Sequence, residues 1–399
     1  MDLIIDENNI VLHYLSSQLD GAEIIYYYNN DLYRSPFLNY QAIFDKVIHL
    51  PYIQSTIKVN GKINWNGNAL LMYKHKKYDH LIRIDEASHS RRKDFVQGIC
   101  AMNAVAVACG IVCIDIHENN IFDTVDGIKW VDLGAFKPVT SDNVNMAFLY
   151  TCAQVHWHIL HSHSAENRNF TVEFISNGPL AQMIALDFAK PESWQKLSEI
   201  VGELKIELKK TEWTEYPDKM IVLNNPTHSI KSKIVWELVK EMEDVRTVID
   251  IGCHVGYYTF LSAKYCDSVL GVDIDEICIN KAVNCMSNLK LPVCFAAQAV
   301  EQLSKNYFHL FDRYKSDMVM ALAIIHHLHK DDKKITPARF VGLLTKLSKK
   351  YILIENITLE DLAIYDKEFV SYGLKLIKRF DIVPDNRKLS LYQNVSVPE

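Results

Sequence analysis

The sequence predicts an α/β domain on a mostly parallel sheet in the C-terminal half and a separate α+β domain in the N-terminal half. One stretch, TVIDIGCHVGYYTFLSAKYCDSVLGVDID at 247–275, reads as strand, glycine turn, helix and a second strand that ends on an acid. A final pair of strand-like segments, 373–380 and 388–395, predicts antiparallel strands that close the same sheet. In the N-terminal half, short strand-like runs precede a largely apolar helix at 93–109.

Length and composition bound the organisation of the chain. At 399 residues it has room for two domains, which we expect at 1–150 and 216–399, with 151–215 as a helical connector or the remainder of the first domain. Hydrophobic residues at 49% and charged residues at 23% are typical of a globular protein. The net charge of −6 argues against a nucleic-acid partner.

The same reading predicts a cytoplasmic protein without a transmembrane segment. The N-terminus, MDLIIDENNIV, has no basic region of the kind that opens a secretory signal. The longest apolar run, 99–114, is too short to span a bilayer. The nine cysteines form no C-x-x-C pair, as expected of free thiols in a reducing cytosol.

Residues 111–136 are the first stretch that suggests chemistry. Phosphotransfer from ATP needs an acid to orient the attacking hydroxyl, and an amide and a second acid to hold Mg²⁺. Asp115, Asn120 and Asp132 have these identities, and a hairpin-like segment with Asp126-Gly127 at its turn lies between the last two. A hairpin that carries acids by chance is the alternative.

DIHENN at 115–120 resembles the Asp-x-His-x-x-Asn catalytic loop of protein-kinase-like and aminoglycoside-phosphotransferase-like enzymes. The resemblance implies a kinase-like α+β domain that uses ATP and Mg²⁺, with Asp115 as catalytic residue and Asn120 and Asp132 as metal ligands. Residues 1–33 contain one glycine, Gly21, so a glycine-rich loop over the ATP phosphates is missing. A kinase fold that has lost phosphotransfer therefore stays open.

The middle of the chain suggests connection rather than chemistry. HWHILHSH at 156–163 invites a metal site, but histidines two apart on a helix point away from each other, and we favour a polar helix end. The charged segment 203–219 is interpreted as a solvated domain boundary. Residues 231–245 then form an amphipathic helix that leads into the 247 strand.

The glycine turn at 250–256 predicts a nucleotide site. A dinucleotide fingerprint needs glycines at its third and sixth positions, where this chain has His254 and Tyr257. What remains is Asp250-x-Gly252-x-x-x-Gly256, with Asp273 21 residues after Gly252. Such glycines let the backbone approach a ligand, and the acid can accept hydrogen bonds from ribose hydroxyls.

This pattern resembles motif I and the following acid of class I S-adenosylmethionine (SAM) methyltransferases, with His254 in place of the middle glycine. The resemblance implies a Rossmann-like sheet, SAM as cofactor, and Gln298 at the adenine edge, where the family commonly has Asp. It assigns cofactor contacts to Asp250, Gly252, His254, Gly256, Asp273 and Gln298. Gly256→Val is then expected to block SAM binding without unfolding the N-terminal domain. The alternative is a plain strand-to-helix turn in another α/β fold.

A fourth strand-like run, 316–325, is followed directly by His326 and His327. Ligands of open α/β sheets lie beyond the carboxyl ends of the strands, so these histidines are candidate catalytic residues. An imidazole with a pKa near neutrality can take the proton of a hydroxyl as it attacks a methyl group. Alternatively, both histidines cap a helix or pack against the cofactor.

ALAIIHHL at 321–328 and RKLSLY at 387–392 resemble segments of bacterial polysaccharide-capping and nodulation-type methyltransferases. This implies O-methylation of a hydroxyl or phosphate on a glycan or small-molecule acceptor, with a kinase-like domain that phosphorylates the same acceptor. Two alternatives stay open. The N-terminal domain is a pseudokinase that only binds, or the protein is a small-molecule phosphotransferase with a regulatory SAM-binding domain.

Overall fold

The chain forms two compact units in a computed structural model. The structure describes residues 23–29, 43, 46–53, 56–65, 68–76, 78–130, 135–160, 180–205, 208, 210–215, 229–303, 313–328, 335–383 and 386–395. The first unit comprises 1–78, 92–122 and 128–206, and the second comprises 79–91, 123–127 and 207–399. Two short segments of the N-terminal half thus belong to the second unit, which the predicted domain ranges did not anticipate.

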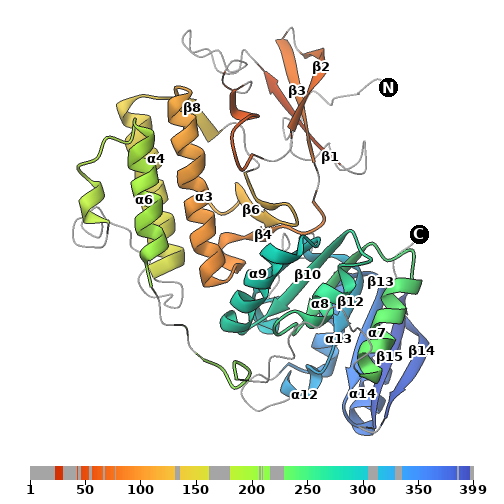
Figure 1. Ribbon diagram of the computed structural model, residues 1–399. Helices are drawn as coiled ribbons and strands as arrows, with labels where there is room; N and C mark the ends of the chain where they lie inside the picture. The colour runs from red at the N-terminus through yellow and green to blue at the C-terminus, as the bar shows by residue number, and fades with distance from the viewer. Residues whose placement is uncertain are drawn as a thin grey trace. The chain divides into compact units, whose positions relative to one another are not determined.

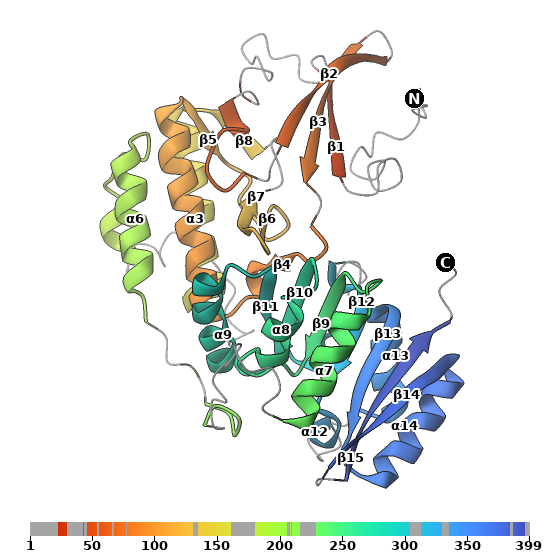
Figure 2. The same ribbon diagram turned by 45° about the vertical axis from the view of Figure 1, so that its right-hand side comes forward.

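The first unit opens with a three-stranded antiparallel sheet in the order β1-β3-β2. The strands are β1 (Glu23–Asn29), β2 (Thr56–Trp65) and β3 (Asn68–Lys76). The helices that follow are α3 (His89–Ala108), α4 (Ser141–Gln154) and α6 (Pro191–Glu203), with π-helical η3 (Val155–Leu160) and 3-10 helix η4 (Ala181–Met183) between the last two. In Figures 1 and 2, α3 and α6 run side by side. Most side chains of α3 are buried, as its apolar sequence predicted.

The predicted hairpin is present between α3 and α4. Its strands are β6 (Ile121–Thr124) and β7 (Gly127–Trp130), and they lie in sequence between a second pair, β5 (Ile111–Cys113) and β8 (Phe136–Pro138). The turn is Val125-Asp126 rather than Asp126-Gly127, because Gly127 already belongs to β7. Its φ of +85° explains the glycine there.

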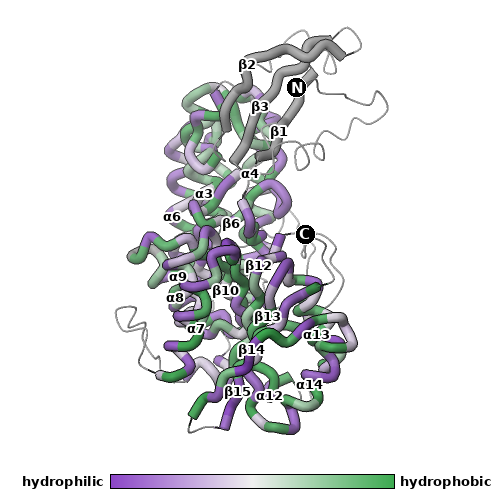
Figure 3. Tube along the Cα trace, turned by 90° about the vertical axis from the view of Figure 1, so that its right-hand side faces the viewer, coloured by the Kyte–Doolittle hydropathy of each residue, from purple (hydrophilic) through white to green (hydrophobic). Residues whose placement is uncertain are grey.

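The second unit is built on a seven-stranded sheet in the order β11-β10-β9-β12-β13-β15-β14 (Figure 1). The strands are β9 (Thr247–Ile251), β10 (Ser268–Asp273), β11 (Val293–Ala297), β12 (Ser316–Ala321), β13 (Ser348–Asn356), β14 (Leu374–Ile382) and β15 (Arg387–Asn394). The first five are parallel, and β15 is antiparallel to both β13 and β14. This confirms the predicted closing pair. Figure 3 marks the inner strands as hydrophobic, as expected of strands covered on both faces.

Helices cover both faces of this sheet. They are α7 (Ile230–Glu241), α8 (Tyr257–Ser262), α9 (Glu276–Leu289), α10 (Val300–Leu303), α12 (Ile325–Leu328), α13 (Pro337–Leu347) and α14 (Leu359–Ser371). In Figures 1 and 2, α7 and α8 lie together on one face and α13 and α14 on the other. Right-handed crossovers require this, because the strand order runs outward from β9 to β11 and then resumes at β12 on its other side. The switch point between β9 and β12 is where an open α/β sheet binds its ligand.

The segment 79–91, with β4 (Ile82–Arg83) and η1 (Ile84–Glu86), is anchored to the second unit by buried polar contacts. The imidazole of His80 lies 2.7 Å from the Ser268 hydroxyl and 2.8 Å from the Ser316 hydroxyl, at the first residues of β10 and β12. Burial lowers the pKa of His80 to about 3, so the ring is neutral. The guanidinium of Arg313 and the hydroxyl of Tyr314 donate to the Glu86 carboxylate.

None of the helices in the described part of the chain combines the length and the apolar character needed to cross a membrane.

Candidate functional site

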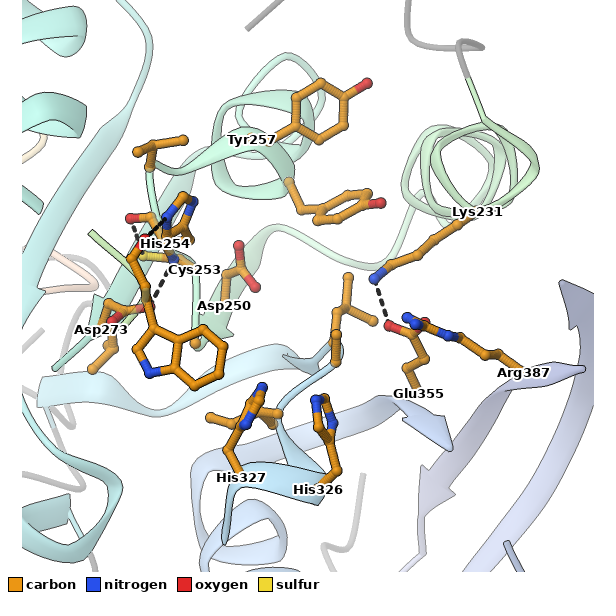
Figure 4. Close-up of a pocket in the computed structure, with 18 of the residues that line it drawn as sticks. Lys231, Asp250, Cys253, His254, Tyr257, Asp273, His326, His327, Glu355 and Arg387 are labelled. Atoms are coloured by element: carbon orange, nitrogen blue, oxygen red, sulfur yellow. Dashed lines mark hydrogen bonds and ion pairs between the residues drawn. The ribbon is translucent and has the colours of Figure 1, made fainter. Parts of the chain in front are cut away.

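A cavity of about 700 Å³ opens at the switch point of the seven-stranded sheet (Figure 4). This volume is within the usual range for small-molecule sites, about 300–1,000 Å³. Seven of the residues predicted from the sequence line it: Asp250, Gly252, His254, Asp273, Gln298, His326 and His327. The predicted residue of the same turn that does not line it is Gly256.

The turn between β9 and α8 passes through left-handed backbone three times. Gly252 has φ +78°, His254 φ +53° and Gly256 φ +83°. His254 therefore keeps the backbone conformation of the glycine that the methyltransferase pattern has there, at the steric cost that a side chain carries in this region. A Cβ on Gly252 would lie 2.9 Å from Cδ1 of Ile324, so this glycine lets the loop after β12 approach the turn.

Gly256 has a different role from the one expected. A Cβ there would lie 2.9 Å from the ring of Phe295 and 3.0 Å from that of Phe260, both buried in the core of the unit. The glycine gives room to the core and not to a ligand. A side chain at position 256 would therefore meet the rings of Phe295 and Phe260 first.

The side chain of Asp273 ties the ends of β9 and β10 together. Its Oδ2 accepts from the backbone N–H of His254 at 2.7 Å, and its Oδ1 accepts from that of Asp275 at 2.9 Å. Burial raises the pKa of Asp273. The backbone of Gln298, at the end of β11, donates to the Asp273 carbonyl at 2.8 Å. The amide nitrogen of the Gln298 side chain is 3.5 Å from the carbonyl of Asp85.

Asp250 supplies a second carboxyl group in the cavity, and this one is buried. It is 2% exposed, and Thr259 donates its hydroxyl hydrogen to Oδ2 at 2.8 Å. Burial raises the pKa of Asp250 to about 6. Two carboxyl groups whose ionisation is opposed by burial favour a positively charged ligand, because a nearby cation lowers the cost of both charges.

The two predicted histidines lie together on the short helix α12, which begins four residues after β12 ends. Their ring centroids are 3.6 Å apart. Two rings this close can both contact one acceptor group in the cavity. Either imidazole can act as a general base toward such a group.

Trp213 also lines the cavity, and it was not predicted because the charged segment 203–219 was interpreted as solvated. Its ring centroid is 4.0 Å from that of His327, and its carbonyl oxygen lies 3.1 Å from Nε2 of His254. Thr211 and Thr214, on either side, both donate to Oδ2 of Asp275, Thr214 at 2.6 Å. Burial would raise the pKa of Asp275, but these hydrogen bonds bring it below its usual value. The single tryptophan in this charged segment is the feature of the sequence that could have indicated a buried contact there.

A charged cluster at the other end of the cavity was also missed. Glu355, at the end of β13, has 0% exposed surface and forms ion pairs with Lys231 and Arg387. Lys231 lies near the start of α7, and its ammonium is 5.0 Å from the ring centroid of Tyr258. In Figure 4 this cluster and Asp273 lie on opposite sides of His326 and His327.

The predicted phosphotransfer residues are only partly described. Asp115 is an exposed loop residue whose carboxylate is 3.5 Å from Nε2 of His117. Asn120 donates its side-chain amide to the backbone carbonyl of Asp115 at 2.9 Å. Asp132 lies outside the described residues. Among the residues that the structure describes, no three His, Cys, Asp or Glu side chains gather closely enough to hold a metal ion.

Comparison with known proteins identifies the kind of domain that holds the cavity. Residues 248–346 match the family model described as a methyltransferase domain. No curated protein matches the chain. The similar solved structures include magnesium protoporphyrin IX methyltransferase from Synechocystis PCC 6803 with bound SAM, 16% identical over 41% of this chain and 76% of that chain, with a TM-score of 0.33.

Two further solved structures are similar to the same extent. N-methyltransferase NodS from Bradyrhizobium japonicum WM9 is 13% identical over 42% of this chain and 94% of its own, with a TM-score of 0.33. WbdD in complex with the kinase inhibitor LY294002 is 20% identical over 40% of each chain, with a TM-score of 0.31. The family match and the order of the strands establish a class I SAM-dependent methyltransferase domain in the C-terminal region.

Proposed function

We propose that this protein transfers a methyl group from SAM to an oxygen of a glycan or small-molecule acceptor, either a hydroxyl or a phosphate oxygen. The observation that supports this most strongly is the composition of the cavity. Two carboxyl groups, the buried Asp250 and the half-buried Asp273, share it with the paired imidazoles of His326 and His327. The first pair suits a cationic nucleoside, and the second suits an acceptor that must lose a proton.

Four groups of the chain would hold the cofactor, which supplies a methyl group on a positively charged sulfur. The Asp273 carboxylate has spare lone pairs for the ribose hydroxyls, because each oxygen accepts one backbone N–H. The Asp250 carboxylate lines the cavity, where the positive charge of the cofactor's sulfur would stabilise its ionised form. Gly252 exposes the backbone of the turn, and Gln298 lies at the end of β11, where its amide can hydrogen-bond the adenine edge.

His326 or His327 takes the proton of the acceptor as the new bond to the methyl group forms. One imidazole of the pair is the base, and the imidazolium that results lies beside the ring of the other histidine. A phosphate oxygen is already ionised near pH 7, and for such an acceptor the histidines act by positioning instead. Methyl transfer to a hydroxyl should therefore depend more strongly on His326 and His327 than methyl transfer to a phosphate.

The test is a thermal-shift panel on the full chain with SAM, S-adenosylhomocysteine, ATP and ADP, each with and without Mg²⁺. SAM and S-adenosylhomocysteine are expected to raise the melting temperature without Mg²⁺, since a ligand of the native state stabilises it in proportion to its occupancy. Calorimetry then gives the dissociation constants. Failure of both ligands to bind would refute the proposed function.

We extend the proposal to the N-terminal unit, as a kinase-like domain that phosphorylates the same acceptor. The supporting observation is the hydrogen bond from Asn120 to the Asp115 carbonyl, which holds the amide beside the loop that carries the candidate catalytic acid. The amide oxygen of Asn120 then remains for a metal ion. A Mg²⁺-dependent shift with ATP supports an active domain, and its absence favours a binding module. A cytosolic location is part of the proposal, since all nine thiols are free.

A further inference from the structure

The cluster of Lys231, Glu355 and Arg387 lies in the same cavity as the proposed methyl-transfer site. With its side chains in their ordinary charge states the cluster carries one net positive charge. Glu355 accepts from Lys231 at Oε2 and from Arg387 at Oε1, the latter at 3.3 Å. The carboxylate thus fixes both cations in place but neutralises only one of them.

Of the two cations, Arg387 is the more exposed and has more donors to spare among the described residues. Among the described residues its guanidinium forms one hydrogen bond, from one of its five N–H groups, and its side chain is 37% exposed, compared with 16% for Lys231. Leu389 is the strand partner of Glu355, and Arg387 lies two residues before Leu389 on the same strand. The side chains of Arg387 and Glu355 therefore point to the same face of the sheet. A guanidinium held by a buried carboxylate presents its planar fork in a fixed direction, which suits a carboxylate or a phosphate.

The position of Arg387 along the sheet sets it apart from the predicted nucleoside site. Arg387 begins β15, three strands from β9, and strands about 4.8 Å apart place it about 14 Å from the glycine turn. The candidate ribose acid, Asp273, lies in the opposite direction, and the two histidines lie between (Figure 4). For a methyl acceptor whose nucleophile is at His326 or His327, Arg387 is therefore on the side away from the predicted nucleoside site.

We propose that the acceptor carries a carboxylate or phosphate group, which Arg387 binds while Glu355 and Lys231 hold the guanidinium in place. This inference rests on the proposed function, because it assigns the remaining part of the cavity to the acceptor. The same anion chemistry has a second source, the carboxylate of the cofactor's own amino-acid tail. The experiment must separate the two sources.

The test compares Arg387→Gln with the matched control Lys388→Gln in the full chain. Lys388 follows Arg387 on the same strand, points to the opposite face and pairs with Asp381, so its substitution removes the same charge outside the cavity. Each variant is saturated with S-adenosylhomocysteine and titrated with inorganic phosphate at constant ionic strength. Arg387→Gln is expected to weaken phosphate binding about tenfold, as the loss of a charge-assisted hydrogen bond does. Lys388→Gln is expected to match the wild type, and Arg387→Lys to fall between.

The second arm measures S-adenosylhomocysteine and 5′-methylthioadenosine, which lacks the amino-acid tail, against the same variants. Both are expected to bind Arg387→Gln as they bind the wild type. Selective loss of S-adenosylhomocysteine affinity assigns the anion site to the cofactor and overturns the inference, while the proposed methyltransferase function stands. Phosphate binding that is undetectable in the wild type, or unchanged by Arg387→Gln, overturns it as well. Failure of the wild type to bind S-adenosylhomocysteine is the separate outcome that refutes the function itself.

Discussion

The carboxylate of Asp273 accepts the backbone N–H of His254 at 2.7 Å, and this hydrogen bond joins the end of β10 to the turn that follows β9. His254 occupies left-handed backbone at φ +53°. The acid therefore fixes the shape of the turn as well as offering lone pairs to a ligand. Substitutions at this pair separate the two roles.

Asp273→Asn is expected to weaken S-adenosylhomocysteine binding about tenfold, because the charge-assisted hydrogen bonds to the ribose become neutral ones. Asp273→Ala is expected to weaken it further, since the N–H groups of His254 and Asp275 also lose their acceptor. Isothermal titration calorimetry measures both. The control is Asp267→Asn, an exposed acid just before β10. Unchanged affinity in Asp273→Ala would show that the ribose contact is misassigned.

His326→Ala combined with His327→Ala is expected to abolish methyl transfer to a hydroxyl acceptor, with a loss of about 10²–10⁴-fold in kcat. Each single substitution is expected to cost less, because the remaining ring lies only 3.6 Å from the position of the ring that was removed. Transfer of labelled methyl from SAM measures turnover. Affinity for S-adenosylhomocysteine serves as the control and should stay near the wild-type value. Full turnover in the double variant rules out a base at this position.

Cofactor binding is expected to weaken as the pH falls below about 6. Burial raises the pKa of Asp250 to about 6 from 3.8, so the free protein protonates it over the range where an ordinary Asp is ionised. A cationic ligand favours the ionised form, and binding near pH 5 should release a proton. Calorimetry in two buffers of different ionisation enthalpy measures this release, which Asp250→Asn should remove.

The same group affects stability in the opposite direction. Between pH 3.8 and 6 the folded state binds the Asp250 proton more tightly than the unfolded state. The free energy of unfolding therefore falls as the pH rises through this window, by an amount of order 3 kcal/mol, and stays lower above it. Chemical denaturation of the ligand-free protein between pH 4 and 7 tests the sign. Asp250→Asn should reduce this dependence, and an unchanged slope would contradict the shifted pKa.

Gly256→Ala is expected to destabilise the methyltransferase domain more than Gly373→Ala. Both glycines have left-handed backbone, φ +83° and +79°, so both variants carry the same strain. The Gly256 Cβ meets the rings of Phe295 and Phe260, whereas none of the described residues has an atom within 4 Å of the Gly373 Cβ. Overpacking of this kind costs about 1–3 kcal/mol, and Gly256→Val should cost more. Thermal unfolding measures the difference. Equal melting temperatures for the two alanine variants would mean that the core accommodates the extra methyl group.

Binding of S-adenosylhomocysteine is expected to change the tryptophan fluorescence of the protein, because the Trp213 indole lines the cavity beside His327. The change should disappear in Trp213→Phe. Thr214→Val removes one of the two hydroxyl donors to Asp275 and should weaken the change without abolishing it. A signal that persists in Trp213→Phe must come from another of the six tryptophans.

The β9–β10 unit was predictable from the sequence because its signals are local. Burial and backbone geometry within about 30 residues determine all three of its features. These are the apolar strand, the glycine turn and the acid at the end of the next strand. The closing strands β14 and β15 and the placement of His326 and His327 at the end of β12 follow from the same rules. These features let the sequence predict the cavity and seven of its lining residues.

Only the tertiary structure decided which other segments complete the cavity. Thr211 and Thr214 bind Asp275, more than sixty residues away, and Lys231 pairs with Glu355 at a separation of 124 residues. The Cβ position of Gly256 faces Phe295 because β11 lies beside β10. Periodicity records which face of an element is buried but not what covers it. Partners far apart in the chain become visible only when the sheet brings their strands together.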